Sequence, residues 1–224
     1  MAAHQRHVLM IASDDMRPEI SPYGKTQVST PNLQRLADEG ALFRRAYVSV
    51  ALCGPSRSAL LTGRRPDSSR VWGMFYFRET TGANYTTLPQ HFRQHGYRSI
   101  GIGKIFHPGV PSGGSLASGE DQDQRFGSWS VPHYMPTDEW SLRDHSYLEV
   151  NASWWQLTDG KAVVRAREWI RNASQYEEPL FLAVGFHKPH LPYIYPSSNA
   201  FKGSVHFPPD NHFLTDGVPP VASE

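Results

Sequence analysis

The single cysteine of the chain, Cys53, lies in the segment ALCGPSRSALLTGR, residues 51–64. Free cysteines are most often buried and inert, so by residue type alone this thiol would simply fill the core. Its surroundings favour chemistry instead. Pro55 can begin a helix, which leaves Cys53 beside unpaired amides and the positive end of the helix dipole, where an anion is stabilised. Arg57 adds a guanidinium group, whose fixed, positively charged donors suit an oxyanion. The segment therefore predicts an anion-binding site around the thiol.

Acidic and basic side chains follow three apolar segments that the sequence predicts as strands. Ligands bind beyond the carboxyl ends of parallel strands, so these side chains would meet at one edge of a sheet. Asp14 and Asp15 are adjacent carboxylates that repel each other unless a cation lies between them, which favours Ca²⁺ or Mg²⁺. Taken singly, the aspartates suit a turn or helix cap, and the bases suit solvated or satisfied loop positions. The bases are Lys104, His107, His187, Lys188 and His190.

Strands and helices alternate along the chain, which predicts an α/β fold with a mainly parallel sheet. The run at 179–186 is apolar throughout and typical of a strand that is buried on both faces. The expected strands are residues 7–13, 41–48, 97–103 and 179–186.

Helix signals lie between these strands. Thr30 is the predicted N-cap and Gly40 the stop of a helix at 31–39, and glycines also close helices predicted at 56–63 and 88–96. Residues 108–130 and 192–224 are rich in Gly, Ser or Pro and are predicted as long loops. One further helix would bury a face that consists of Ala162, Val163, Ala166, Trp169 and Ile170.

Length and charge exclude several classes of protein. The 224 residues include 22 Lys and Arg against 21 Asp and Glu, so no global field recruits nucleic acid or a membrane surface. One cysteine forms no internal disulfide, so apolar packing has to stabilise what we expect to be one soluble domain over residues 1–224. The apolar run at 8–12 is too short for a signal peptide or a membrane span, so we expect no export signal in the chain as written.

Residues 53–64 resemble the signature of the sulfatase family, Cys-x-Pro-Ser-Arg-x-x-x-x-Thr-Gly-Arg, at every specified position. The similarity continues in VLMIASDDMRP, TPNLQRLA, LTGRRPDSSR, IGIGKIFHPG and PLFLAVGFHKPHLP. These segments are more similar to sulfatases that act on the 2-sulfate of iduronate than to arylsulfatases. The resemblance implies the N-terminal portion of a catalytic domain: a three-layer α/β sandwich around a mainly parallel sheet, like that of alkaline phosphatase, but incomplete.

In that family a formylglycine-generating enzyme, which needs the Pro and Arg that follow, oxidises the signature cysteine to formylglycine. The hydrate of this aldehyde is the nucleophile, and a metal makes its hydroxyl acidic enough to attack. Carried over to this chain, Asp14, Asp15 and position 53 would bind one Ca²⁺ ion. Arg57 would hold the hydrate and the metal in place.

The same resemblance assigns the bases to the sulfate and the leaving group. Lys104 and His107 match the family's strand-end pair, and His190 matches the histidine that faces the sulfate and the departing sugar oxygen, with His187 as a neighbour. The implied reaction hydrolyses a sulfate ester on a uronic acid of a glycosaminoglycan, the 2-sulfate of iduronate in heparan or dermatan sulfate. The implied location is the lysosome.

Some parts of the family pattern do not match. The family's second pair of metal ligands, an Asp-His or Asp-Asn, and another lysine come from a segment beyond the last residue, so we expect a fragment that holds half of the metal site. Residues 144 and 145 are an Asp followed by a His, as in that pair, but no apolar strand precedes them. Glycosylation sequons at Asn84, Asn151 and Asn172 are compatible with the secretory route that lysosomal delivery requires.

Two other functions stay open. A non-catalytic remnant would keep the fold and bind sulfated glycans through local Arg and Lys, because half of the metal ligands are missing. A metal-dependent phosphodiesterase would use the same scaffold, although phosphoryl transfer has no evident need for Pro55, Ser56 and Arg57 at those offsets.

Overall fold

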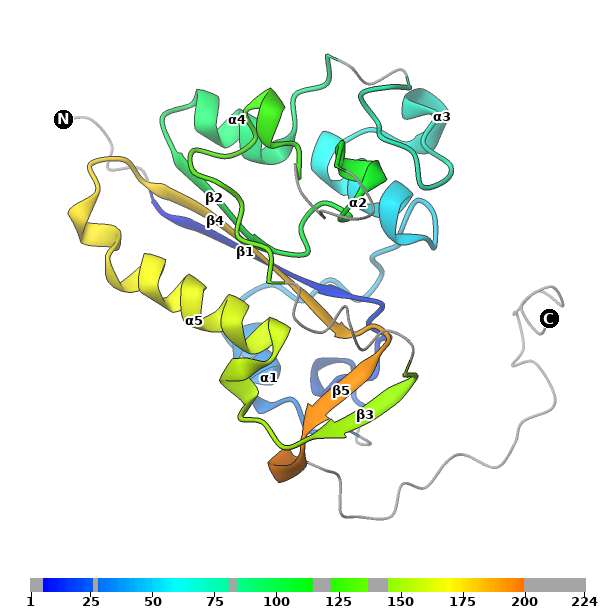
Figure 1. Ribbon diagram of the computed structural model, residues 1–224, viewed down its shortest axis with the longest axis vertical. Helices are drawn as coiled ribbons and strands as arrows, with labels where there is room; N and C mark the ends of the chain where they lie inside the picture. The colour runs from blue at the N-terminus through cyan, green and yellow to red at the C-terminus, as the bar shows by residue number, and fades with distance from the viewer. Residues whose placement is uncertain (1–5, 26–27, 81–83, 115–121, 137–144, 200–224) are drawn as a thin grey trace, which may run out of the picture.

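The centre of the molecule is a parallel three-stranded sheet (Figure 1). The computed structural model describes residues 6–25, 28–80, 84–114, 122–136 and 145–199. The strand order is β1 (Val8–Asp14), β4 (Leu180–Pro189), β2 (Arg98–Gly103). β4 lies in the middle, and its residues 180–185 are all buried, as expected of an apolar strand covered on both faces. Parallel pairing brings the carboxyl ends of the three strands to one edge.

Helices cover both faces of this sheet and give the three layers that the family resemblance implies (Figure 1). α5 (Thr158–Arg171) covers one face, where Ala162 packs in a cluster with Leu182 of β4. On the other face, α2 (Cys53–Thr62) contributes Leu61 to a second cluster that includes Phe181 of β4. Alternate residues of β4 therefore belong to different cores, because successive side chains of a strand point to opposite faces.

The remaining elements are short. α4 (Leu88–Gln94) packs beside β2, and its N-cap Thr87 forms a reciprocal capping box with Gln90. None of the helices in the described ranges is long and apolar enough to cross a membrane. The other helices and strands are α1 (Pro31–Glu39), α3 (Pro66–Ser69), β3 (Tyr147–Val150) and β5 (Tyr193–Pro196).

Three expectations about these elements are wrong. Residues 41–48 form no strand, because no strand in the described part of the chain pairs with them and their alternation is broken by Arg44 and Arg45. α2 begins at Cys53 itself rather than after Pro55, since proline is tolerated throughout a first helical turn. Ile170 is 51% exposed, so the buried stripe of α5 ends earlier than expected.

The two predicted loops contain some regular structure. Residues 193–196 form β5, which pairs in parallel with β3, a partner about 45 residues earlier in the chain that local sequence patterns do not reveal. Short 3₁₀ turns occupy 110–112 and 124–126 within the other segment. Residues 115–121 and 200–224, which complete the two predicted loops, lie outside the described residues.

Two glycines allow the ends of β2 and β4 to approach each other closely. A Cβ atom on Gly185 would lie 2.0 Å from the carbonyl oxygen of Lys104, and one on Gly103 would lie 2.1 Å from the carbonyl oxygen of Gly185. Gly103 also has a φ of +69°, which disfavours any other residue. The amide of Lys104 donates to Gly185 at 2.8 Å, so this contact determines where the Lys104 side chain leaves the sheet.

We expect Gly185→Ala to lower the free energy of unfolding by more than about 2 kcal/mol, because the new methyl group would push the strand ends apart. Gly24→Ala is the matched control. Gly24 has a φ of +79° and no atom within 4 Å of an added Cβ, so its cost is backbone strain of about 1 kcal/mol. Urea unfolding followed by circular dichroism compares the two, and equal losses would contradict the steric argument.

Candidate active site

Position 53 lies at the first turn of α2. Leu52 is the N-cap and has extended backbone, and Pro55 occupies the first turn, where its missing amide hydrogen is not needed. The helix ends at Gly63, whose φ of 64° is the left-handed conformation of a helix C-cap. The thiol therefore lies where the first amides of a helix are unpaired and the dipole is positive.

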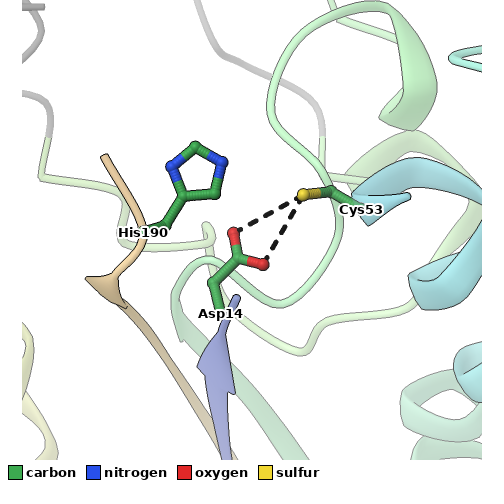
Figure 2. A group of neighbouring side chains, drawn as sticks. All are labelled: Asp14, Cys53 and His190. Atoms are coloured by element: carbon green, nitrogen blue, oxygen red, sulfur yellow. Dashed lines mark hydrogen bonds between the residues drawn. The ribbon is translucent and has the colours of Figure 1, made fainter. Parts of the chain in front are cut away.

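Three segments that are far apart in the sequence meet at this thiol (Figure 2). Asp14 comes from the end of β1, Cys53 from the start of α2, and His190 from the chain just beyond β4. The Sγ atom of Cys53 donates to the Asp14 carboxylate, at 3.6 Å from Oδ1 and 3.9 Å from Oδ2. One ligand atom from each of the three residues lies within 4.8 Å of the others.

Two buried cations hold the Asp14 carboxylate. The Lys104 ammonium contacts Oδ2, and Nη2 of Arg57 lies 3.4 Å from Oδ1. Arg57 also donates to the carbonyl oxygens of Lys104 and Ile105, the latter at 2.8 Å. Arg57 is 8% exposed and Lys104 is 4% exposed, so these charges interact with little screening by solvent.

The charges around Asp14 keep it ionised. Burial alone would raise the pKa of the Asp14 carboxyl, but the hydrogen bond from Lys104 and the charges of Arg57 and Lys104 outweigh it and lower the pKa to about 2. Burial raises the pKa of the Cys53 thiol, and the Asp14 carboxylate raises it further, against the opposing charge of Lys104. The thiol is therefore protonated at neutral pH and is not an activated thiolate.

Two further histidines near the cluster are neutral. Burial, followed by the charge of Lys104, lowers the pKa of His107 to about 4 and that of His187 to about 3. Nδ1 of His107 lies 2.8 Å from the carbonyl oxygen of Pro108, and Nδ1 of His190 lies 2.6 Å from that of Leu191. A carbonyl only accepts, so Nδ1 carries the proton in both rings and Nε2 is free.

The structure thus groups Asp14, Cys53 and His190 and places Arg57 and Lys104 against them. His107 and His187 lie close enough for the charges of Lys104 and Arg57 to lower their pKa values. Asp15 differs: its side chain is exposed, its φ is 53°, and it is not part of the group around the thiol. A left-handed residue directly after Asp14 turns the chain at the strand end, and this turn accounts for the exposure.

The grouped side chains fit a divalent cation. An ionised carboxylate, a sulfur atom and a free imidazole nitrogen offer three donors within 4.8 Å, which is a suitable spacing for one ion. As a thiol, position 53 favours softer metals. Oxygen atoms at that position, as in an aldehyde hydrate, would make the set more suitable for Ca²⁺.

The chain belongs to the sulfatase family, whose family model matches residues 6–213. Among the curated proteins it is similar to human iduronate 2-sulfatase, with 34% identity over 238 residues, covering 96% of this chain and 41% of that protein. The chain therefore spans about two fifths of the length of that relative.

Solved structures share the fold. A phosphonate monoester hydrolase of Agrobacterium radiobacter superposes with a TM-score of 0.63 at 22% identity, covering 86% of this chain and 43% of that one. A 2-O GAG sulfatase superposes with a TM-score of 0.56 at 23% identity, covering 84% and 36%. These likenesses confirm the expected α/β architecture of the alkaline phosphatase and sulfatase type.

We expect Asp14→Asn to lower the pKa of Cys53, because the negative charge that stabilises the protonated thiol is lost. Alkylation of the thiol by iodoacetamide, measured by mass spectrometry over a range of pH, should then become faster near neutrality. Asp15→Asn is the matched control, since its side chain is exposed and outside the group. Unchanged alkylation in Asp14→Asn would contradict the described contact.

Stability should fall as pH is lowered from about 6.5 to about 4. An unfolded histidine titrates near 6.5, whereas the pKa of His187 is about 3 and that of His107 about 4 in the fold, so the unfolded chain binds more protons in this window. Urea unfolding at several pH values should show a shallower slope for His187→Gln than for the parent. The exposed His95→Gln is the control, and equal slopes for all three would show the explanation to be wrong.

Proposed function

We propose that the chain carries the nucleophile-bearing part of a sulfatase active site. Position 53, oxidised to formylglycine and hydrated, would supply the hydroxyl that attacks the sulfur of a sulfate ester. The observation that carries this proposal is the meeting of Cys53 with Asp14 and His190 at the start of α2, in a chain of the sulfatase family. The raised pKa of Cys53 supports a precursor role, since a protonated thiol is itself a poor nucleophile.

Asp14 and position 53 are the proposed ligands of one Ca²⁺ ion, which when bound would make the attacking hydroxyl more acidic. The ionised, acceptor-only carboxylate of Asp14 supports its assignment. Asp15 stays a proposed third ligand by resemblance, although its side chain is exposed. Arg57 fixes the start of α2 against the end of β2 and so holds position 53 beside Asp14.

The remaining side chains would act on the sulfate and the leaving group. Lys104 and Arg57 place two positive charges where negative charge grows on the sulfate oxygens in the transition state. The proposed proton shuttle is His190: its Nε2 would take up the proton that the attacking hydroxyl releases and then give it to the sugar oxygen as the sulfur–oxygen bond to it breaks. His107, neutral at working pH with its proton on Nδ1, would accept at Nε2 a hydrogen bond from the leaving oxygen once that oxygen has been protonated.

The proposed substrate is a sulfated uronic acid of a glycosaminoglycan, the 2-sulfate of iduronate in heparan or dermatan sulfate. The 34% identity to human iduronate 2-sulfatase supports this choice over other sulfate esters. The formylglycine-generating enzyme is the proposed partner for position 53, and the lysosome is the proposed location.

A second candidate is a non-catalytic sulfatase fold that binds sulfated glycans. Two observations favour it. The carboxylate oxygens of Asp14 already contact Lys104 and Arg57, and the side chain of Asp15 is exposed, so neither aspartate is arranged around a metal ion. A phosphodiesterase on the same scaffold ranks below both, because the segment around position 53 follows the sulfatase signature.

Co-expression with a formylglycine-generating enzyme tests the main proposal. We expect mass spectrometry of the peptide that contains position 53 to show replacement of the thiol by an aldehyde, and the product to cleave an aryl sulfate faster than an aryl phosphate. Cys53→Ala should abolish turnover. Arg57→Lys should lower it about a hundredfold, because the guanidinium contacts to Asp14 and to the carbonyl oxygens of Lys104 and Ile105 are lost.

Two other outcomes would contradict this proposal and favour one of the alternatives. An unmodified thiol together with glycan binding and no turnover would favour the non-catalytic fold. A preference for the aryl phosphate would favour the phosphodiesterase.

A further inference from the structure

The end of β4 leaves the regular pairing with β1 just before the active site. Ser13 of β1 is paired with Phe186, but the next residue, Asp14, is paired with Pro189. His187 and Lys188 therefore form a bulge with no counterpart on β1. Such bulges turn a strand and change where its following side chains point, and they are common beside active sites. Here the bulge is followed by Pro189, which pairs with Asp14, and then by His190.

One side chain, Asp159, satisfies both amides of this bulge. Its Oδ1 accepts from the amide of His187 at 2.8 Å, and its Oδ2 accepts from the amide of Lys188 at 2.9 Å. Hydrogen bonds to an ionised carboxylate are about twice as strong as neutral ones, so the two bonds hold the bulge firmly. Sequence analysis missed this residue, because an aspartate in the first turn of a helix is common and needs no special explanation.

The elements around Asp159 fix its own position. It lies in the first turn of α5, where a negative charge is stabilised by the helix dipole. Gly160, the next residue, lets the preceding 3₁₀ turn pack directly on the helix: a Cβ there would lie 1.9 Å from the carbonyl oxygen of Trp154. Asp159 thus reaches the bulge from a rigid element of the core.

Other bonds then connect the bulge to the site. Oγ of Ser13 donates to the carbonyl of Lys188 at 2.6 Å, and the amide of His190 donates to the carbonyl of His187 at 2.9 Å. His190 is therefore bonded to a residue that Asp159 holds, and Ser13 is the neighbour of Asp14. The bulge forms a connection between α5 and the two side chains that face position 53.

We propose that Asp159 is a positioning residue for the active site, which acts through the His187–Lys188 bulge to place His190 beside Asp14 and Cys53. The inference rests on the proposed function only in treating these three residues as the site. The role goes beyond helix capping, because both carboxylate oxygens accept from amides of β4.

Hydrogen exchange by NMR tests the first step and needs no turnover. In Asp159→Asn the amide nitrogen of the new side chain cannot accept, so we expect the amide of His187 or Lys188 to exchange about tenfold faster. The amides of Leu182 and Val184, inside the sheet, should be unchanged. Glu168→Gln is the matched control on the same helix, since the Glu168 carboxylate is half exposed and pairs with exposed Arg165. Unchanged exchange at 187 and 188 in Asp159→Asn would overturn the proposal.

Binding of Cd²⁺ to the unmodified chain tests the second step. Cys53, Asp14 and His190 offer a sulfur, an oxygen and a nitrogen ligand, and Cd²⁺ bound to a thiolate has a characteristic ultraviolet absorption. We expect Asp159→Asn to weaken Cd²⁺ binding about tenfold, as loss of an outer-shell partner commonly does. In a His190→Ala background the same substitution should have no further effect, because residues that act through one another are not additive.

A purely structural role predicts a different result. General destabilisation would weaken Cd²⁺ binding equally with and without His190, and this additivity would overturn the proposal, as would a parent chain that does not bind Cd²⁺. Asp159→Glu, which keeps both acceptor oxygens, should restore part of the affinity. Failure to convert position 53 or to hydrolyse sulfate esters would contradict the proposed function and leave these two measurements unaffected.

Discussion

A buried carboxylate held between two cations is the interaction on which the candidate site depends. Asp14 ends β1, Lys104 follows β2 and Arg57 belongs to α2, so one charge cluster joins three elements. Removing such charges from water costs several kcal/mol per ion, and only good geometry with additional hydrogen bonds offsets that cost. Arg57 provides them by bonding two backbone carbonyls beyond β2. The cluster is thus conformationally defined, and it concentrates positive charge beside position 53.

The sheet supplies the rigid frame for this cluster. β4 is the central strand; Asp14 ends its neighbour β1, and Lys104 directly follows its other neighbour, β2. The contact between Gly103 and Gly185 brings Lys104 close to β4, and the bulge at 187–188 directs the chain back towards β1. Small irregularities at the strand ends, rather than the regular part of the sheet, therefore determine the geometry of the site.

Much of this arrangement could be predicted from local sequence. The strands β1, β2 and β4 are short apolar runs, and α1, α4 and α5 have either capping signals or a periodic apolar face, so local patterns suffice for them. The prediction failed where a partner decides the outcome. Residues 41–48 have the composition of a strand, but no described strand pairs with them. β5 does pair with a strand, β3, but that strand lies far away in the sequence.

The candidate site shows the same division. Cys53, Arg57 and the residues after each strand stand out by type and spacing, so sequence alone could select them. The exposure of Asp15 depends on a turn of the backbone, and the contacts of Asp159 join residues 28 and 29 positions apart. Neither has a local signal, because each follows from how the strand ends turn after the sheet has formed.

The burial of the signature around position 53 limits when that residue can be chemically altered. Pro55 is buried and Arg57 is 8% exposed with its guanidinium bonded inside the protein. A formylglycine-generating enzyme that has to bind Pro55 and Arg57 in order to oxidise the thiol cannot reach them once α2 has packed on the sheet. Under the proposed chemistry, maturation has to act on the nascent chain, and a polypeptide that folds first would stay permanently in its thiol form.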